Sequence, residues 1–350
     1  MDFALLLPGP LDQLTGGYLY ARRVVEGLKA RGERVGLFEL PGQYPDADAA
    51  ARQAACAALA SLPDGHVAVI DGLTLPAFAG CLARESRRLR LVGFIHHPLS
   101  LETGLDAATA RHYAALEAGL WPRLSGALCP GRHTALAVAA SGLAAERVVI
   151  VPPGTLKPAA RTSPTRQQGP LRILSVATVT PRKGHRLLVE ALAGLQDLDW
   201  RLDCIGSLER DPATAVALRG QIESLQLGAR IRLLGEQSTA QLAEAYHHSD
   251  LFALPSFHEG YGMVLAEALA HGLPIVATRA GAIPDTVPDS AALLVPPGDV
   301  PALRAALRQL LADDQARGRL ADGAAAAAAA LPDWPLAVDR WAAALARVST

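Results

Sequence analysis

The chain has 350 residues, of which 50% are hydrophobic and 19% charged, and its formal net charge is -1. This composition excludes a disordered chain, and the near-zero charge provides no global positive field for binding nucleic acid. Because a chain of this length exceeds what one hydrophobic core usually covers, we expect two domains.

The first half of the chain alternates short apolar runs with helical segments. Residues 2–10 predict a strand that ends in a turn, and the amphipathic pattern of residues 18–32 predicts a helix closed by Gly32. Further strands are expected at residues 34–40, 66–72, 89–97, 126–131 and 147–154. Strands that alternate with helices indicate βαβ units and a parallel sheet.

A segment dense in Pro, Gly and polar residues, 152–170, interrupts this alternation and predicts an interdomain linker. The pattern then restarts, with strands expected at residues 171–178, 200–206, 230–235, 251–256, 274–278 and 291–296. We therefore predict two similar α/β domains, residues 1–155 and 165–330. Open α/β sheets bind ligands outside the carboxyl ends of their strands, so the cleft between the domains is the expected site.

The four cysteines, Cys56, Cys81, Cys129 and Cys204, show no C-x-x-C spacing. We therefore expect free thiols in a reducing cytoplasm, and neither a zinc site nor a redox pair. The N-terminus resembles no signal peptide, and the alanine run 324–330 is too short to span a membrane. The basic cluster 84–91 favours a solvated helix face over a membrane patch, so membrane association is not evident.

Three stretches carry residues suited to anion binding. In "PGPLDQLTGGYLYARR" (8–23), Gly16 and Gly17 lie between a strand and a helix, where their amides could approach an anion. A plain strand–helix turn explains this stretch equally well. In "VATVTPRKGH" (176–185), we expect Arg182 and Lys183 in a first helical turn, where cations oppose the helix dipole. A bound phosphate would justify them, although two exposed basic residues without a task remain the alternative.

The third stretch, "SFHEGYGMVLAEALAHGLPIVAT" (256–278), is the most informative. Residues 263–270 form a helix that is apolar nearly all round and is therefore expected to be buried, yet it carries Glu267. Because a buried glutamate without a partner is costly, we expect a sugar hydroxyl pair or a cation to bind it. Glu259 lies eight residues earlier in the preceding loop, and Gly262 marks the helix start. The eight-residue spacing and the neighbouring phosphate cradles favour ligand binding over the acid and nucleophile of a glycosidase.

The order of these motifs resembles glycosyltransferase family 4. The stretch "EGYGMVLAE" is similar to the family's Glu-x7-Glu signature, and "GG", "FIHH", "VPPGT", "RKG" and "AALLVPPGD" match further motifs in the expected order. The resemblance covers nearly the whole chain. It implies the GT-B fold, in which two Rossmann-like domains face each other across a cleft and a C-terminal helix, here 332–350, crosses back to the N-terminal domain. Trp334 and Trp341 would then be packing anchors.

The resemblance also implies roles for individual residues. Glu267 would hold the donor ribose, Glu259 would contact the transferred sugar, and Lys183 would bind phosphate. His96 would act near the sugar and the acceptor. The donor-binding set would comprise Gly16, Gly17, Thr178, Gly260, Tyr261, Gly262, Met263, Val264 and Glu267.

Three departures from the family pattern stand out. Thr178 occupies the position of a phosphate-binding arginine, so Arg182 is the expected substitute, and the usual histidine–aspartate pair is replaced by His96–His97. Asp285 stands where a loop glutamate is usual. On the acceptor side we expect Asp71, His97 and Arg132, with Arg132 and Thr134 exposed to the cleft. The partner of His96 is left open.

The expected function is transfer of a sugar from a nucleoside-diphosphate sugar with retention of configuration. Retention by front-face attack is implied by the resemblance, whereas the cations and helix amides would stabilise the departing diphosphate without a metal or other cofactor. The "DAD" sequence (46–48), which superficially resembles a metal-binding motif, is better explained as a helix N-terminus. The nucleotide base (UDP, GDP or ADP), the sugar, the acceptor and the oligomeric state are not specified.

Three other function classes remain possible from sequence. A sugar-nucleotide epimerase on the same fold would need a carboxylate set that is not recognisable here. A non-catalytic nucleotide-sugar-binding subunit would not need His96, Lys183, Glu259 and Glu267 together. An NAD-dependent oxidoreductase would need a G-x-G-x-x-G motif after a strand, followed by an acidic residue, and that motif is missing.

Overall fold

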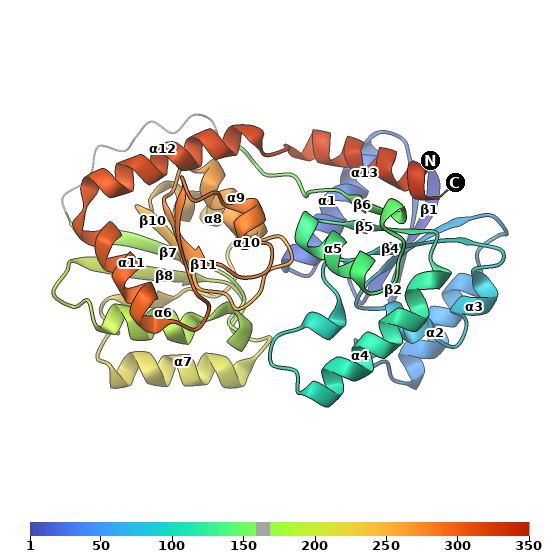
Figure 1. Ribbon diagram of the computed structural model, residues 1–350, viewed down its shortest axis with the longest axis horizontal. Coiled ribbons are helices and arrows are strands. Elements are labelled where there is room, and N and C mark those ends of the chain that lie inside the picture. Colours follow the sequence, from blue (N-terminus) through green and yellow to red (C-terminus); the bar gives the residue numbers. More distant parts are fainter. Residues whose placement is uncertain (159–168, 350) are drawn as a thin grey trace. The chain divides into compact units, whose positions relative to one another are not determined.

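The computed structural model describes residues 1–158 and 169–349 (Figure 1). The chain divides into two compact units: unit 1 is Met1–Gly154 with Pro332–Thr350, and unit 2 is Thr155–Leu331. Each unit carries a six-stranded sheet whose paired strands run parallel. The predicted α/β class with two parallel sheets is therefore confirmed, and the predicted linker falls partly outside the described residues.

Unit 1 has the strand order β2-β1-β3-β4-β5-β6. Its strands are β1 (Asp2–Pro8), β2 (Arg34–Leu40), β3 (Val67–Asp71), β4 (Arg90–Phe94), β5 (Gly126–Cys129) and β6 (Val148–Ile150). Its helices are α1 (Gly16–Ala30), α2 (Ala49–Ala60), α3 (Leu82–Glu85), α4 (Ala107–Leu120), α5 (Arg132–Ala140) and α13 (Trp334–Val348). All six strands expected in the first half are present.

Unit 2 has the strand order β12-β11-β10-β7-β8-β9. Its strands are β7 (Leu171–Val176), β8 (Trp200–Ile205), β9 (Ile231–Leu233), β10 (Leu251–Leu254), β11 (Ile275–Thr278) and β12 (Ala292–Val295). Its helices are α6 (His185–Ala193), α7 (Pro212–Ser224), α8 (Thr239–His247), α9 (Met263–Ala270), α10 (Ile283–Thr286), α11 (Val300–Ala312) and α12 (Asp314–Ala330).

The central strands of unit 2 are apolar on both faces because helices cover both sides of the sheet (Figure 1). In β10, Leu251 and Ala253 pack into one apolar cluster, whereas Phe252 and Leu254 pack into another. This alternation follows from successive strand side chains pointing to opposite faces. The sheet is therefore packed on both faces, and the loops of unit 2 begin at the carboxyl ends of its strands.

Helix α13 belongs to unit 1 and packs against α1. A β-carbon on Gly27 of α1 would lie 2.6 Å from a methyl carbon of Val338, so the two helices approach closely. Trp341 is 0% exposed and its ring lies 5.3 Å from that of Phe3. Trp334 packs beside Tyr20, with ring centroids 6.2 Å apart. The predicted packing role of both tryptophans is therefore confirmed.

Asp46 and Asp48 both have structural partners in unit 1. Asp48 is the N-cap of α2, and its carboxylate accepts from the amide of Ala51 at 2.7 Å. Asp46 accepts from the hydroxyl of Tyr113 at 2.7 Å. The helix-cap interpretation of "DAD" is thus confirmed for Asp48.

The expectation that all four cysteines are free is wrong. Cys56 in α2 and Cys81, just before α3, form a disulfide with Cα atoms 5.8 Å apart, while Cys129 and Cys204 are free and buried. Burial raises the pKa of both free thiols to about 12. Sequence spacing could not reveal the disulfide because α2 and the segment before α3 meet only through tertiary packing.

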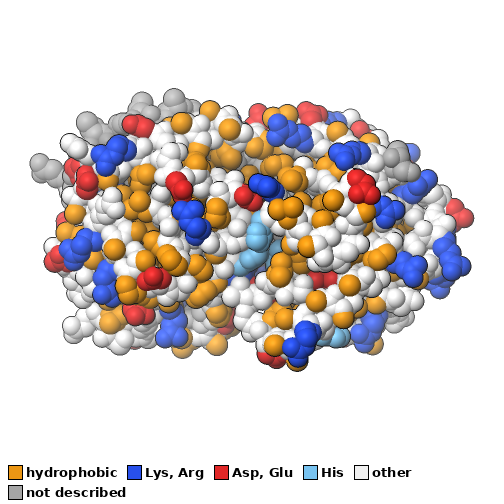
Figure 2. Space-filling view, viewed as in Figure 1, with side chains coloured by type: hydrophobic (Ala, Val, Ile, Leu, Met, Phe, Trp, Pro, Cys, Tyr) orange, Lys and Arg blue, Asp and Glu red, His pale blue; other side chains and the backbone are white. Residues whose placement is uncertain are grey.

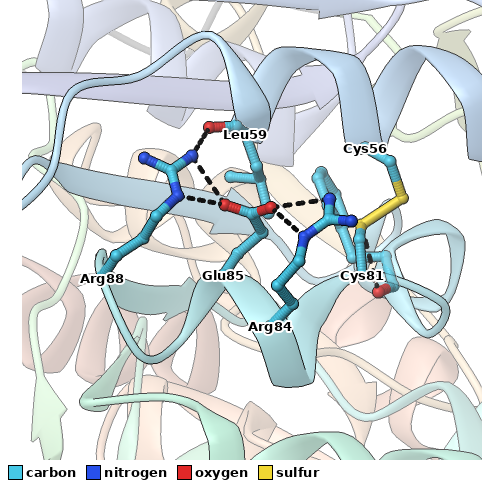
Figure 3. Close-up of a disulfide and its surroundings, with 7 residues drawn as sticks. Cys56, Leu59, Cys81, Arg84, Glu85 and Arg88 are labelled. Atoms are coloured by element: carbon cyan, nitrogen blue, oxygen red, sulfur yellow. Dashed lines mark hydrogen bonds and ion pairs between the residues drawn. A yellow bond between two sulfur atoms is a disulfide. The ribbon is translucent and has the colours of Figure 1, made fainter.

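The disulfide lies beside a cluster of two arginines around a buried glutamate (Figure 3). Glu85 is 2% exposed and pairs with Arg84 at 2.8 Å and with Arg88 at 2.6 Å. Arg88 also donates to the carbonyl of Leu59 at 2.7 Å, which ties this cluster to α2. Two arginines of the basic cluster 84–91 therefore have a structural role. No helix among residues 1–158 and 169–349 is long and apolar enough to cross a bilayer.

Thiol counting tests the disulfide. We expect alkylation of the unreduced, denatured protein to modify only Cys129 and Cys204, and alkylation after reduction to modify all four cysteines. Because the disulfide closes a 25-residue separation, we expect replacement of both Cys56 and Cys81 by Ser to lower the free energy of unfolding by roughly 3 kcal/mol. Four modified thiols without reductant would contradict the disulfide.

Candidate functional site

Unit 2 places two loops at the carboxyl ends of neighbouring central strands. Residues 255–262 join β10 to α9, and residues 177–184 join β7 to α6. Since β10 and β7 are hydrogen-bonded neighbours running parallel, both loops leave the same edge of the sheet. This edge is where open α/β sheets bind ligands.

The two loops are joined through their backbones. Gly184 has a φ of +70°, and a β-carbon at this position would overlap the carbonyl oxygen of Pro255. The amide of Phe257 donates to the carbonyl of Arg182 at 2.8 Å, and the guanidinium of Arg182 donates to the carbonyl of His258 at 2.9 Å. Glycine is the residue that combines this backbone conformation with so close an approach.

Lys183 and Glu259 form the central ion pair of this edge. The ammonium of Lys183 donates to both carboxylate oxygens of Glu259, at 2.7 Å to Oε1 and 2.9 Å to Oε2. The side chains are 14% and 7% exposed, respectively. Arg182 lies farther away, with its guanidinium 4.0 Å from Oε2. The hydroxyl of Ser256 donates to Oε1 at 2.6 Å.

Glu259 is held in its ionised form. Burial alone would raise the pKa of this carboxyl, but the opposing effects of Lys183, Arg182 and the Ser256 hydroxyl together lower its pKa below the ordinary value. Glu259 is therefore a carboxylate at neutral pH, and its charge partly neutralises the two cations.

The predicted placement of Arg182 and Lys183 in a first helical turn is wrong. Both belong to a short 3₁₀ helix, Pro181–Lys183, and Gly184 separates them from α6. They therefore do not extend the helix whose dipole they were expected to oppose. Glu259 provides their negative partner, so a bound phosphate is not needed to explain their position.

The other side of the 255–262 loop rests on the segment between β11 and α10. A β-carbon on Gly281, whose φ is +54°, would overlap the carbonyl oxygen of Glu259. That carbonyl accepts from the amide of Ala282 at 2.8 Å, and the hydroxyl of Thr286 donates to the carbonyl of Tyr261 at 2.6 Å. The loop is therefore held on two sides by backbone contacts.

The predicted donor-binding residues 260–264 lie together where this loop enters α9. Gly262 is the N-cap, and Met263 and Val264 are the first helical residues. Among the residues that the structure describes, no side chain caps this helix start. The amides of a helix N-terminus favour anions. The uncapped start of α9 thus follows Glu259, the acidic partner of Lys183, within a few residues along the chain.

Glu267 has a partner that the sequence did not reveal. The hydroxyl of Tyr246 in α8 lies 2.9 Å from Glu267 Oε2 and 3.2 Å from the carbonyl of Val264. Burial raises the pKa of Glu267 to about 7, and the Tyr246 hydrogen bond acts in the opposite direction. The expectation that Glu267 requires a ligand is therefore incomplete, because Tyr246 already supplies one hydrogen bond.

Thr178 follows β7 at the same edge of the sheet. A β-carbon on Gly206, which follows β8, would overlap the carbonyl of Ala177 and would lie 2.9 Å from the amide of Thr178. Thr178 is therefore fixed beside the carboxyl end of the neighbouring strand. Its side chain is partly buried.

In unit 1, the predicted residues cluster at the carboxyl ends of β3 and β4. His96 Nε2 lies 3.3 Å from a carboxylate oxygen of Asp71 but forms no hydrogen bond with the described residues, so Asp71 is a close acidic neighbour of the ring rather than a hydrogen-bonded partner. Gly16 and Gly17 begin α1, and a β-carbon on Gly17 would lie 3.3 Å from the His96 ring. The ring also packs against Phe94, with centroids 4.6 Å apart.

The loop after β4 contains a second paired histidine. His97 Nε2 lies 3.0 Å from a carboxylate oxygen of Glu102. Arg132 is exposed at the start of α5. The expectation that Thr134 is exposed is wrong: it is 0% exposed and its hydroxyl donates to the carbonyl of His96 at 3.1 Å. Thr134 therefore faces inward because it satisfies that carbonyl.

Sequence reasoning missed the hydroxyl side chains that contact both glutamates. Ser256 and Tyr246 bind Glu259 and Glu267, respectively. Ser256 follows the predicted strand 251–256, so a small hydroxyl residue at a strand's carboxyl end was an available signal. Tyr246 lies on another helix, and no local pattern links it to Glu267.

Charge is mixed on the surface in view. Figure 2 shows basic and acidic side chains scattered among apolar ones on one face of the molecule. Among residues 1–158 and 169–349, no group of three or more His, Cys, Asp or Glu side chains has an arrangement that could hold a metal ion. Metal independence nevertheless stays a prediction.

Residues 157–326 match the family model described as "Glycosyl transferases group 1". D-inositol 3-phosphate glycosyltransferase of Corynebacterium glutamicum is 35% identical over 154 residues, which are 43% of this chain and 37% of that protein. MMP alpha-(1->4)-mannosyltransferase of Mycolicibacterium hassiacum is 28% identical over 260 residues, which are 70% of this chain and 62% of that protein. The chain thus spans less than two thirds of the length of these relatives.

Solved structures match across nearly the whole chain. Sucrose-phosphate synthase from Thermosynechococcus elongatus has a TM-score of 0.81 at 21% identity, with 98% of each chain covered. The chain has the GT-B fold. Anabaena HepE in complex with UDP and glucose is a second GT-B match, with a TM-score of 0.77, 20% identity and 99% of each chain covered. The family match thus falls on unit 2, and the solved structures show the fold of the whole chain.

The raised pKa of Glu267 predicts a pH-dependent stability of the GT-B chain. Above its ordinary pKa of 4.5 the unfolded carboxyl ionises, whereas the folded carboxyl stays protonated up to about pH 7. Stability is therefore lost as pH rises through this window. Because glutamine mimics the protonated form, we expect Glu267→Gln to gain roughly 1–3 kcal/mol over the native protein between pH 5 and pH 8.

Urea unfolding of both proteins at the two pH values measures this gain. A difference in unfolding free energy that does not change with pH would show that Glu267 ionises normally in the folded protein.

Proposed function

We propose that this chain is a retaining, family 4-like glycosyltransferase that binds a nucleoside-diphosphate sugar at the 255–262 edge of unit 2. The observation that carries the proposal is the Lys183–Glu259 pair, followed along the chain by the uncapped start of α9. A diphosphate needs cations and amide donors, and this edge supplies the cations from the 177–184 loop and the amides from the start of α9.

Different residues contact the diphosphate, the ribose and the transferred sugar of the donor. Lys183, Arg182 and the backbone of residues 260–264 bind the diphosphate. Glu267 holds the ribose hydroxyls, and Glu259 contacts the transferred sugar. Thr178 borders the phosphate region. Gly16 and Gly17, at the start of α1 in unit 1, stay predicted donor-binding residues.

The acceptor side uses residues of unit 1. His96, whose ring lies near Asp71, acts beside the sugar and the acceptor, and His97 and Arg132 bind the acceptor. Two of the proteins compared have a phosphate compound in their names, D-inositol 3-phosphate and sucrose-phosphate. The exposed guanidinium of Arg132 would suit an anionic acceptor of this kind.

The chemistry follows from the charges that develop during transfer. Cleavage of the sugar–phosphate bond places negative charge on the diphosphate, which Lys183, Arg182 and the helix amides stabilise. The acceptor hydroxyl attacks from the face that the diphosphate leaves, so configuration is retained. No metal or other cofactor is required in this scheme, because the cations take its electrostatic role.

A sugar-nucleotide epimerase and a non-catalytic nucleotide-sugar-binding subunit are the alternatives on this fold. The three functions differ in their products. Transfer releases a nucleoside diphosphate and a glycoside, epimerisation leaves the nucleotide linked to a new sugar, and a binding subunit leaves its ligand unchanged.

Thermal unfolding with UDP, GDP, ADP and their sugars tests the donor class. A ligand that binds only the native state at 100 times its Kd adds about 2.7 kcal/mol, which corresponds to a Tm rise of about 4 °C for a chain of this length. We expect one nucleoside diphosphate to produce such a rise and NAD to produce none. Glu267→Ala should abolish most of it, because the ribose contact is lost. A rise with NAD alone would sink the donor proposal.

Chelation tests metal independence. Once a donor is identified, we expect the rate of nucleoside-diphosphate release to be unchanged by EDTA, because Lys183 and Arg182 supply the positive charge. Lys183→Ala should lower that rate by about a hundredfold, as loss of a charge-stabilising donor does in other enzymes. Complete loss of activity in EDTA that Mg²⁺ restores would contradict this scheme.

A further inference from the structure

Two buried hydroxyls lie behind the Lys183–Glu259 pair. Ser256 is 0% exposed and Thr278, the last residue of β11, is 1% exposed. The hydroxyl of Ser256 donates to Glu259 Oε1 at 2.6 Å, and the hydroxyl of Thr278 donates to the carbonyl of Ser256. Ser256 therefore links β11 to Glu259, because its carbonyl accepts from Thr278 and its hydroxyl donates to the carboxylate that also accepts from Lys183.

The two oxygens of Glu259 are used differently. Oε1 accepts from Ser256 at 2.6 Å and from Lys183 at 2.7 Å, which occupies both of its acceptor positions. Oε2 accepts from Lys183 at 2.9 Å, with Arg182 4.0 Å away. One acceptor position of Oε2 is therefore not used by these contacts. Ser256 thus distinguishes the two oxygens and fixes the rotation of the carboxylate.

The backbone around Glu259 is fixed from the same direction. Its carbonyl accepts from the amide of Ala282 at 2.8 Å, while the carbonyl of Ser256 accepts from Thr278. Both ends of the segment 256–259 are therefore tied to β11 and the residues that follow it. Neither the carboxylate nor its backbone can shift without breaking a buried hydrogen bond.

We infer that Ser256 and Thr278 are positioning residues that hold the Glu259 carboxylate, and through it the Lys183 ammonium, in one orientation. The part of this inference that concerns a ligand rests on the proposed function: the fixed ammonium faces the diphosphate of the donor. The part that concerns Lys183 itself does not depend on any ligand.

Lysine is the residue for which such positioning matters. Its ammonium sits on a flexible four-carbon stem, so an unguided side chain would spread over many rotamers. A bidentate contact with a fixed carboxylate removes that freedom before a ligand arrives. Preorganised charge stabilises a developing negative charge more effectively than charge that must first reorient.

The lysine content allows a direct measurement. The chain has three lysines, Lys29, Lys157 and Lys183, and the first two are exposed. We would treat the ligand-free, full-length protein with trace acetic anhydride and measure the acylation of each lysine by mass spectrometry. The ion pair lowers the reactivity of Lys183, and the ratio of its rate to that of Lys29 reports how firmly it is held.

Ser256→Ala and Thr278→Val remove the two hydroxyls with little change in volume. We expect Ser256→Ala to raise the Lys183-to-Lys29 ratio about fivefold, because one hydrogen bond to a charged group is lost. Thr278→Val should raise it less, because it acts through Ser256. Thr278→Ser keeps the hydroxyl and should restore the native ratio.

Ser175→Ala is the matched control. Ser175 in β7 is also 0% exposed, but its hydroxyl has no hydrogen-bond partner among the described residues. We expect the Lys183-to-Lys29 acylation ratio of Ser175→Ala to equal that of the native protein. An unchanged ratio in both Ser256→Ala and Thr278→Val, or an equal rise in Ser175→Ala, would overturn the positioning role.

The part of the inference that concerns a ligand is tested by measuring the binding of UDP and UMP, and in parallel of GDP with GMP and of ADP with AMP. We expect Ser256→Ala to weaken binding of the diphosphate about fivefold and to leave the monophosphate within about twofold, because the held ammonium faces the diphosphate. Tighter binding of the diphosphate by Ser256→Ala would overturn the ligand part of the inference. If the native protein binds none of these nucleotides but the acylation ratio rises in Ser256→Ala, the proposed function fails and the positioning role stands.

Discussion

The buried ion pair between Lys183 and Glu259 is the interaction on which the candidate site depends. Transfer of both charges from water is costly, and their attraction offsets that cost only when the remaining hydrogen-bonding positions are also satisfied. Ser256 satisfies one of these positions. The close approaches at Gly184 and Gly281 bring the neighbouring loops near enough for the pair to form. The glycine-mediated packing therefore places the two partners of the ion pair within hydrogen-bonding distance.

Most of the fold could be predicted because its signals are local. Apolar runs of strand length alternate with amphipathic segments, and this pattern specified both parallel sheets. The cap at Asp48 and the helix Met263–Ala270 were likewise predictable, since a capping side chain and its helix are adjacent in sequence. The order of motifs also indicated the GT-B fold, because it constrains the chain over its whole length rather than at one position.

The side-chain partners could not be predicted in the same way. Cys56 meets Cys81, Tyr246 meets Glu267, and Thr134 turns inward to the carbonyl of His96 through contacts between separate elements. Each partner is chosen by packing, and the sequence around either residue contains no trace of the other. Glu267 illustrates the consequence: the argument that a buried carboxylate needs a partner was sound, but it could not tell a ligand from a tyrosine within the fold.

The opposite pKa shifts of Glu259 and Glu267 have a common electrostatic consequence. Two cations keep Glu259 ionised, whereas burial favours the protonated form of Glu267 up to about pH 7. Below about pH 7, the edge of unit 2 therefore carries mainly the carboxylate charge of Glu259, which Lys183 and Arg182 match. A second negative charge in the same segment would oppose the approach of any anion. By favouring the protonated form of Glu267 below about pH 7 and by pairing Glu259 with cations, the structure accommodates two carboxyl groups in a segment whose backbone amides favour an anionic ligand.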